Sequence, residues 1–341
     1  MTSLHSNKPW LALAAGVAVV ATLPWLVSEF MASVLLSCLM YIALATSWSL
    51  FCGATRYLSL ATSAFFGVGA YTSAMLLGVL PWPLVILSGA LIATIVAVVM
   101  GAAVLHLRGT YFAVLTFGMT ELIRHAVTFV EKQVSGTVGR VLTVVPSNET
   151  VYLTVLLIAA GAIATAIAIQ RSRFGLALSG IGADEQRAQT LGVDTRLAKI
   201  AGFGITAAFA GAVGAAMAVR WTYIEPAAVF SPFIGFQTVL IALIGGAMTL
   251  WGPLIAAIVF SLLAEWLRLQ VPQLYMISLG VLLILSVLYL PGGLASLRWS
   301  TFQDWGQASR QWWRELREDL GGESARRRAR EKQLRERRHG L

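Results

Sequence analysis

Charged residues are scarce in this chain. Asp, Glu, Lys and Arg make up 12% of its 341 residues, whereas 57% of the residues are hydrophobic. Soluble domains carry about twice that share of charge. The apolar residues come in blocks of roughly 20, the length that crosses the hydrocarbon of a bilayer, and the short alternating segments of a membrane β-barrel are missing. The composition therefore excludes a soluble domain and predicts an all-α polytopic membrane protein.

Cysteine and histidine are also scarce. The two cysteines, Cys38 and Cys52, fall near opposite ends of one predicted helix. At 1.5 Å per residue they lie about 20 Å apart, whereas a disulfide needs Cα atoms within about 7 Å. We therefore interpret both as small core residues. The four histidines form no cluster with cysteine, so the sequence predicts neither a metal site nor a cofactor.

Motifs for nucleotide binding and catalysis are missing. The sequence has no Gly-x4-Gly-Lys-Ser/Thr loop and no Ser/His/Asp or Cys/His set with a plausible common location. We therefore predict a transport subunit and not an enzyme, with any ATP hydrolysis carried out by partner chains. The centres of the apolar blocks hold almost no acidic residues, although carriers driven by protons or sodium usually need one there. This favours a pathway powered from outside the chain over a self-sufficient secondary transporter.

Ten membrane-spanning helices fit the apolar pattern best. With the N-terminus inside, the internal segments carry eight Lys and Arg residues and the tail after Pro291 carries twelve more, against five in the external segments. The positive-inside rule then predicts that both termini are cytoplasmic. The expected spans are residues 10–27, 31–51, 58–80, 83–105, 109–130, 151–169, 198–219, 234–250, 253–267 and 273–290.

Residues 170–199, here called the loop segment, hold more charge than any other stretch between two spans. The segment runs from Arg171 through Asp184 and Glu185 to Lys199 and lies on the predicted cytoplasmic side. We interpret it as a loop that binds a soluble protein. A solvated loop that only holds two spans together is the alternative.

Three ionisable residues share one face of a predicted span. Glu121, Arg124 and His125 stand at i, i+3 and i+4, near the outer end of the span 109–130. Ionisable groups within a span are functional candidates by default. These could form an internal pair that orients the helix, a contact on the substrate path, or a proton relay.

A glycine-rich turn separates the eighth and ninth spans. Residues 245–253 read Gly-Gly-Ala-Met-Thr-Leu-Trp-Gly-Pro, a composition that breaks a helix. The turn is either a simple reversal of the chain or a hinge for alternating access.

The sequence after Pro291 changes character. Trp299, Trp305 and Trp312 recur at near-helical spacing with arginines between them, which predicts an amphipathic helix in the headgroup plane. We expect the Arg-rich end to bind anionic lipid, at about 1 kcal/mol per basic residue near the surface, and not nucleic acid. The chain thus divides into a transmembrane domain, residues 1–291, and a cytoplasmic interfacial helix with a basic tail, residues 292–341. A membrane scaffold that works through this tail is a further alternative.

Three sequence blocks occur in a recognisable order. Residues 64–71 read Ala-Phe-Phe-Gly-Val-Gly-Ala-Tyr, and residues 108–116 read Arg-Gly-Thr-Tyr-Phe-Ala-Val-Leu-Thr and are followed by Glu121. The third block begins at Phe174 and contains Ala-Asp-Glu at 183–185 and Leu-Gly-Val at 191–193. Together the blocks span most of residues 53–260. They resemble the LivM-type permeases of ABC importers for branched-chain amino acids, and the related permeases for urea and amides.

The resemblance implies a function and partners. The chain would be the permease subunit that forms the membrane pathway for small amino acids, branched-chain ones above all, or for urea or short amides. It would lie in the inner or plasma membrane with a second permease subunit, two cytoplasmic ATPase subunits and an external solute-binding protein.

The resemblance also implies functional residues. Ala188 and Leu191, three residues apart on a short helix, would present an apolar face to a groove in the ATPase. The full set expected to couple to the ATPase is Gly182, Ala183, Asp184, Glu185, Ala188, Leu191 and Gly192. The residues expected on the translocation path or at its gate are Tyr111, Thr116, Glu121, Gly136, Thr137, Gly245 and Gly246.

One external segment departs from the family's pattern. Where those permeases have Thr-Gly-Gly-x-x-Gly, residues 135–140 read Ser-Gly-Thr-Val-Gly-Arg. Only part of the glycine pattern is kept, and Arg140 is unexpected. Because this segment faces the incoming solute, the departure leaves the identity of the solute open.

Overall fold

The computed structural model describes residues 8–107, 109–142, 145–221 and 223–270, together with residues 277, 278, 280, 281, 284 and 285. Apart from these last six residues, the predicted tenth span lies outside the described residues. The predicted interfacial helix and Arg-rich tail lie wholly outside them.

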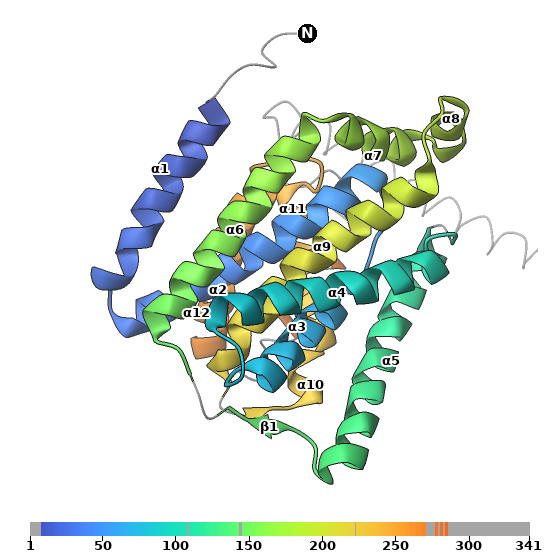
Figure 1. Cartoon of the computed structure of the whole chain (residues 1–341). Coiled ribbons are helices and arrows are strands. Elements are labelled where there is room, and N and C mark those ends of the chain that lie inside the picture. The colour runs from blue at the N-terminus through green and yellow to red at the C-terminus, as the bar shows by residue number, and fades with distance from the viewer. Residues whose placement is uncertain are drawn as a thin grey trace, which may run out of the picture. The chain divides into compact units, whose positions relative to one another are not determined.

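The described chain is a bundle of helices joined by short turns (Figure 1). Two strands of two residues each, β1 (Arg140–Val141) and β2 (Tyr223–Ile224), pair antiparallel at one end of the bundle. The prediction of an all-α protein is therefore confirmed. The helices are α1 (Lys8–Thr22), α2 (Glu29–Trp48), α3 (Thr62–Leu76), α4 (Trp82–Val104), α5 (Thr110–Ser135), α6 (Asn148–Gln170), α7 (Arg173–Ala183), α8 (Glu185–Thr190), α9 (Thr195–Met217), α10 (Pro226–Val229), α11 (Pro232–Gly245) and α12 (Gly252–Gln270).

Seven helical segments in the described ranges are long and apolar enough to cross a membrane, by length and composition. They coincide with seven of the ten predicted spans, so a polytopic helical membrane protein is confirmed. The first predicted span corresponds to a shorter apolar helix, Leu13–Trp25, and the third to α3, which has 15 residues. The number of ten spans stays a prediction. The seven segments are Glu29–Gly53, Trp82–Val104, Thr110–Val134, Asn148–Gln170, Thr195–Arg220, Pro226–Gly245 and Gly252–Gln270.

The chain enters α3 through an extended stretch, so the prediction of a helix from residue 58 is wrong at its start. α2 ends in one turn of π-helix (η2, Ser49–Gly53), and Arg56 then takes a positive φ of 59°. Two side chains bind the backbone that follows: Trp48 Nε1 donates to the Ser59 carbonyl at 2.8 Å, and Thr116 Oγ1 accepts from the Leu60 amide at 3.1 Å. Non-helical backbone at membrane depth persists only where protein satisfies its polar groups, as here.

Small residues let α9 pack closely against α3 and α4. A Cβ on Gly69 would collide with the carbonyl of Gly211, and a Cβ on Gly211 would collide with the side chain of Ala93. Helices in lipid approach this closely where glycine and alanine line the contact. The result is a dense centre in which α9 contacts α2, α3, α4 and α6.

Helices α1 and α5 lie at the edges of this bundle (Figure 1). α1 packs against α6, and α5 contacts α3, α4 and α10 along one narrow face. Most of the α5 surface is therefore exposed in the isolated chain, including Tyr111, Val114 and Leu122.

Candidate functional site

The loop segment folds into two short helices, α7 and α8. Each helix of this region begins at a side-chain cap: Ser172 Oγ accepts from the Gly175 amide at 3.2 Å, and Asp184 Oδ1 accepts from the Gln186 and Arg187 amides at 3.0 and 3.1 Å. Asp194 caps α9 in the same way by accepting from Leu197. These residue types are the preferred N-caps, since their oxygens satisfy amides that the helix leaves free. The polar sequence thus builds an ordered surface.

The predicted coupling residues divide between the outside and the inside of this surface. Ala183, Leu191 and Gly192 are exposed, and Leu191 reaches 83% exposure. Gly182 and Asp184 are half-buried, and Glu185 and Ala188 are buried. Ala188 and Leu191 therefore do not share an exposed face as the sequence suggested, because Leu191 follows the end of α8 while Ala188 packs inward.

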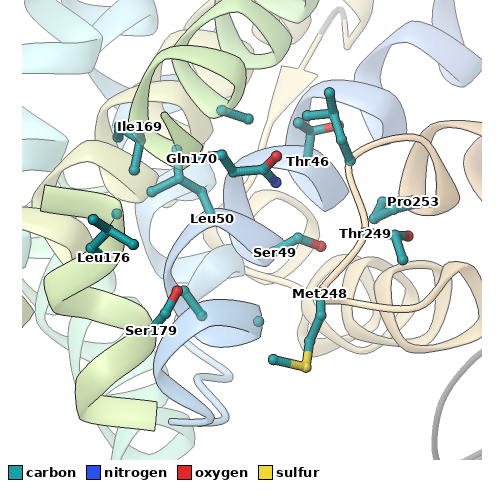
Figure 2. Close-up of a pocket in the computed structure, with 15 residues that line it drawn as sticks. Thr46, Ser49, Leu50, Ile169, Gln170, Leu176, Ser179, Met248, Thr249 and Pro253 are labelled. Carbon is teal, nitrogen blue, oxygen red and sulfur yellow. The ribbon is translucent and has the colours of Figure 1, made fainter. Parts of the chain in front are cut away.

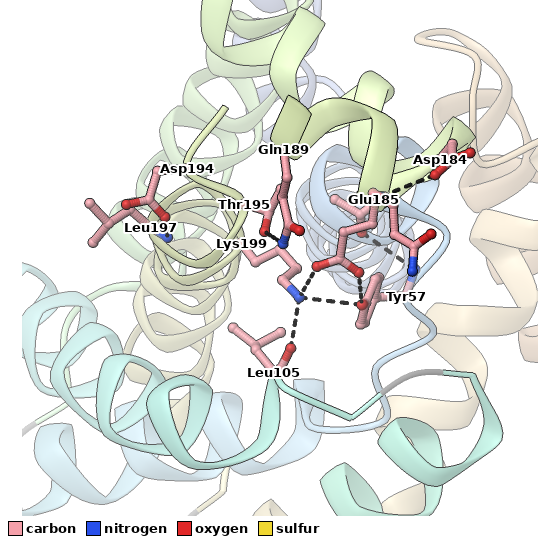
Figure 3. Close-up of polar contacts among 11 residues, drawn as sticks. Tyr57, Leu105, Asp184, Glu185, Gln189, Asp194, Thr195, Leu197 and Lys199 are labelled. Atoms are coloured by element: carbon pink, nitrogen blue, oxygen red, sulfur yellow. Dashed lines mark hydrogen bonds and ion pairs between the residues drawn. The ribbon is translucent and has the colours of Figure 1, made fainter. Parts of the chain in front are cut away.

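Glu185 points into the protein and belongs to a buried polar cluster, here called the Glu185–Lys199 cluster (Figure 3). Lys199 Nζ lies 2.6 Å from Glu185 Oε1, and the Tyr57 hydroxyl donates to Glu185 Oε2 at 2.7 Å. The same ammonium donates to the carbonyl of Leu105 at 2.8 Å and to the Tyr57 hydroxyl at 3.3 Å. The cluster joins α8, α9, the entry to α3 and the end of α4.

Sequence reasoning missed this cluster. Lys199 was counted only as one of the positive charges of the loop segment, and Tyr57 was not considered. The available signal was an isolated lysine at the start of the apolar span 198–219, fourteen residues after Glu185. A buried charge needs a partner, but Asp194 lies nearer to Lys199 in the sequence than Glu185 does, so the sequence does not identify that partner.

A cavity of about 140 Å³ lies beside α7 (Figure 2). It is lined by the end of α2 with its π-turn, the end of α6, α7 and the turn between α11 and α12. The hydroxyls of Thr46 and Ser49 are buried at its wall and have no hydrogen-bond partner among the described residues. A cavity of this size has room for water beside these two hydroxyls. It separates part of α7 from the glycine-rich turn.

The charged residues of α5 lie near the middle of the helix and not near its outer end. The expected span stopped at residue 130, whereas α5 continues to Ser135. Glu121 Oε2 is 2.5 Å from Arg124 Nη2 and 4.0 Å from His125 Nε2. The His125 side chain is 72% exposed, and Arg124 Nε is buried without a partner among the described residues. An ion pair and an imidazole therefore occupy a surface at the centre of a membrane span.

The other two residues predicted on α5 have different surroundings. Tyr111 is 75% exposed and lies in the first turn of the helix. Thr116 is buried, and its hydroxyl accepts from the amide of Leu60. Thr116 therefore supports the entry to α3 and does not face the exposed side of α5.

The end of α5 is tied down by a second buried carboxylate. Gly136 ends the helix in the left-handed conformation, with φ 70°, and Thr137 follows on the surface. Glu131 then accepts from the Gly139 amide at 2.9 Å, from Arg140 Nε at 3.2 Å and from the Tyr71 hydroxyl at 3.1 Å. This set of contacts, here called the Glu131 cluster, gives the unexpected Arg140 a structural partner. Sequence reasoning missed Glu131 and Tyr71.

The glycine-rich turn between α11 and α12 is compact. Gly245 ends α11 directly against the backbone of Gly252, so that a Cβ on Gly245 would collide with it. Gly246 has φ 90°, and Thr249 Oγ1 donates to its carbonyl at 2.9 Å. The two predicted gate glycines thus form the base of a tight reversal.

Metal ligands do not gather in the part of the chain that the structure describes: no group of three or more His, Cys, Asp or Glu residues could hold an ion there. Cys38 and Cys52 are both buried free thiols.

A family model described as branched-chain amino acid transport system / permease component matches residues 30–287. The chain belongs to this permease family. The high-affinity branched-chain amino acid transport system permease protein LivM of Escherichia coli K12 is 26% identical over 306 residues, which cover 80% of this chain and 71% of the relative. The LivM protein of Salmonella typhimurium LT2 is 24% identical over 322 residues, which cover 84% and 75%. No solved structure matches the chain.

The match places the candidate sites within the permease family. It begins at the start of α2 and extends past the end of α12, so it includes the loop segment, α5 and the glycine-rich turn. This permease is accordingly a multi-pass membrane protein of branched-chain amino acid transport systems. The resemblance seen in the three sequence blocks is confirmed.

Proposed function

We propose that this permease is the membrane subunit of an ABC importer that moves small amino acids, branched-chain ones above all, into the cytoplasm. The observation that carries the proposal is the family match over residues 30–287. Both relatives are named as high-affinity transport permeases for branched-chain amino acids. In this proposal two separate ATPase subunits supply the energy, and the sequence of the permease itself holds no Gly-x4-Gly-Lys-Ser/Thr loop.

Residues 182–192 of the loop segment form the proposed docking surface for an ATPase subunit. Ala183, Leu191 and Gly192 present exposed backbone and one large apolar side chain, and Asp184 adds a partly exposed carboxylate. An exposed apolar anchor beside short helices suits a groove in a soluble partner. The buried members of the predicted set, Glu185 and Ala188, and the half-buried Gly182 hold this surface against the membrane domain.

The exposed side of α5 is the proposed wall of the translocation path. Ionisable groups facing lipid at mid-span are costly, yet Glu121, Arg124 and His125 lie on a helix with few neighbours. A second permease subunit, facing α5 across a water-filled path, would remove these groups from lipid. Tyr111 lines the same exposed helix near its start.

The remaining predicted path residues occupy the two ends of the bundle. Gly136 and Thr137 lie beside β1, at the proposed external mouth where a solute-binding protein delivers the solute. Gly245 and Gly246 form the proposed internal gate. Thr116 is buried on α5 and supports the entry to α3 from there. We assign both termini and the loop segment to the cytoplasm, with ten spans in the inner or plasma membrane and the basic tail on anionic lipid.

Reconstituted transport tests this proposal. The permease is purified in mild detergent with the second permease and the ATPase subunits that accompany it, and placed in liposomes with the solute-binding protein. We expect uptake of labelled leucine, isoleucine or valine that requires ATP on the ATPase side. Uptake by the chain alone, driven by a proton or sodium gradient, would contradict the proposal in favour of a secondary transporter. ATP-driven uptake of urea or short amides alone would contradict the assigned solute.

The docking surface is tested in the same system. Ala183→Arg combined with Leu191→Asp changes two exposed residues of the surface and should abolish ATP-driven uptake without removing the permease from the membrane. Leu176→Asp is the matched control, because Leu176 is 71% exposed on α7 and lies outside the proposed surface. Normal uptake by the double variant would count against docking at this surface.

A further inference from the structure

We infer that Lys199 is a positioning residue that transmits movement of the loop segment to α5. This inference rests on the proposed function, in which the loop segment docks the ATPase and α5 lines the path. Lys199 holds α8 and the end of α4 at the same time, through Glu185 and the carbonyl of Leu105. It thereby connects the docking surface to the end of α4, four residues before the helix that bears Glu121.

The ammonium of Lys199 uses its whole hydrogen-bonding capacity within the cluster. A lysine has three N–H donors, and the three acceptors are Glu185 Oε1 at 2.6 Å, the Leu105 carbonyl at 2.8 Å and the Tyr57 hydroxyl at 3.3 Å. Tyr57 also donates to the second oxygen of Glu185 at 2.7 Å. The four groups therefore form a network and not a single pair.

The carbonyl of Leu105 links the network to the chain that leads into α5. Leu105 is the C-cap of α4, where carbonyls lack helical partners and accept other donors. The chain reverses after Leu105 and enters α5 at Thr110, with Gly109 at φ 63°. Only four residues separate the acceptor from the first turn of α5. A shift of α8 would therefore act through Glu185 on Lys199 at the start of α9, and through Lys199 on the Leu105 carbonyl just before α5.

Burial makes this connection stiff. Lys199 is 4% exposed and Glu185 is 9% exposed. Charge-assisted hydrogen bonds are short and strong, and exclusion of water strengthens them further. By contrast, the ion pair between Asp184 and Arg187 on the outer side of α8 has an arginine that is 86% exposed, and such pairs are weak. The inner network thus joins α8 to its neighbours more firmly than this outer ion pair does.

Paired substitutions separate this role from simple stabilisation. Glu185→Leu with Lys199→Met replaces the ion pair by apolar side chains, which buried sites often tolerate because no unpaired charge remains. Glu185→Lys with Lys199→Glu keeps a pair between α8 and α9 but places a carboxylate against the Leu105 carbonyl. Lys199→Arg keeps the charge and the donors. Glu265→Gln with Arg268→Gln removes an ion pair on α12 and is the control.

The readout is transport per ATP hydrolysed by the whole complex in liposomes. We expect both paired variants to assemble with the other subunits, with uptake per ATP hydrolysed reduced about tenfold, within the range of coupling between two sites. Lys199→Arg should keep most of the uptake, and the α12 control all of it. Uptake per ATP equal to wild type in both paired variants would overturn the inference. Absence of ATP-driven uptake by the wild-type complex would contradict the proposed function instead.

A distance measurement needs no variant of the cluster. Spin labels at Gln186→Cys on α8 and Val114→Cys on α5 occupy exposed positions, and the native thiols are buried. In the complex with an intact cluster, the distance between the labels should stay constant between the nucleotide-free and ATP-bound states while each label moves relative to α12. A distance that changes with nucleotide would overturn the inference even if the paired variants failed to fold.

Discussion

At the scale of single residues, two buried carboxylates organise opposite ends of the bundle. Glu131 accepts three hydrogen bonds where α5 ends, and Glu185 is held by a lysine and a tyrosine beneath the loop segment. A carboxylate that leaves water is tolerated only when charges and donors surround it. Each of these acids therefore fixes the position of every residue that it binds.

The Glu131 cluster predicts the effect of removing Arg140. Arg140→Gln takes the cationic partner from a carboxylate that is 4% exposed and should lower the free energy of unfolding by about 1–3 kcal/mol. Thermal unfolding of the purified permease in detergent measures this. Lys132→Gln is the control, because Lys132 is exposed on the last turn of α5, and surface changes of this kind stay within about 0.5 kcal/mol. Equal melting temperatures for both variants would contradict a structural role of Arg140.

Neither buried cluster could be found from the sequence alone. Arg140 looked like a departure from the family's pattern, and only the fold brings Tyr71 to the acid that Arg140 pairs with. Lys199 looked like one more cytoplasmic charge. Sequence spacing predicts which residues share a face of one helix, as it did for Glu121 and Arg124. It does not predict contacts between helices that are far apart in the chain.

At the scale of elements, α7 meets the end of α2 through backbone. A Cβ on Gly182 would collide with the carbonyl of Ala54, one residue after the π-turn, and a Cβ on Gly53 would collide with the carbonyl of Ala247. The π-turn thus lies between the loop segment and the glycine-rich turn. π-turns of this kind occur frequently at functional sites.

This contact predicts opposite effects for two nearby glycines of α7. Gly182→Ala forces the Ala54 carbonyl to move and should destabilise the permease by about 1–3 kcal/mol, as overpacking does. Gly180→Ala should be neutral or stabilising by up to about 1 kcal/mol, because the nearest atom to its new Cβ is 3.9 Å away. Thermal unfolding in detergent compares the two variants. A Gly182→Ala variant as stable as the Gly180→Ala variant would show that the stability of the permease does not depend on the close contact between Gly182 and the Ala54 carbonyl.

The predicted helix boundaries were close where the apolar pattern determines them. The predictions were wrong where tertiary contacts determine the boundary. The long apolar runs predicted α4, α6 and α9 to within a few residues. α5 runs past its predicted end because Glu131 and Lys132 interrupt the apolar pattern without ending the helix, which stops at Gly136. α3 begins later than predicted because the chain before it is extended. Trp48 and Thr116 form hydrogen bonds with the backbone of this extended stretch, and such contacts cannot be predicted from the sequence.

At the scale of the whole molecule, most of the predicted architecture followed from composition and charge. Low charge and long apolar blocks were enough to predict a polytopic helical membrane protein. Three sequence blocks were enough to predict the permease family. Orientation depends on a different property, the distribution of Lys and Arg among the segments. The structure places Thr137 in the segment between α5 and α6 and Gln186 on α8, on the two sides that the charge count predicts to be external and cytoplasmic.

Labelling at these two positions therefore measures the orientation of the permease in the membrane. Thr137→Cys and Gln186→Cys both place a thiol at an exposed position, while Cys38 and Cys52 are buried and should stay unreactive. In sealed right-side-out membrane vesicles, an impermeant thiol reagent should label Thr137→Cys at once and should label Gln186→Cys only after the membrane is permeabilised. The reverse order would place the loop segment outside, where no ATPase could dock. Because that result would invert every span together, it would contradict the assignment of both termini as well as the docking surface.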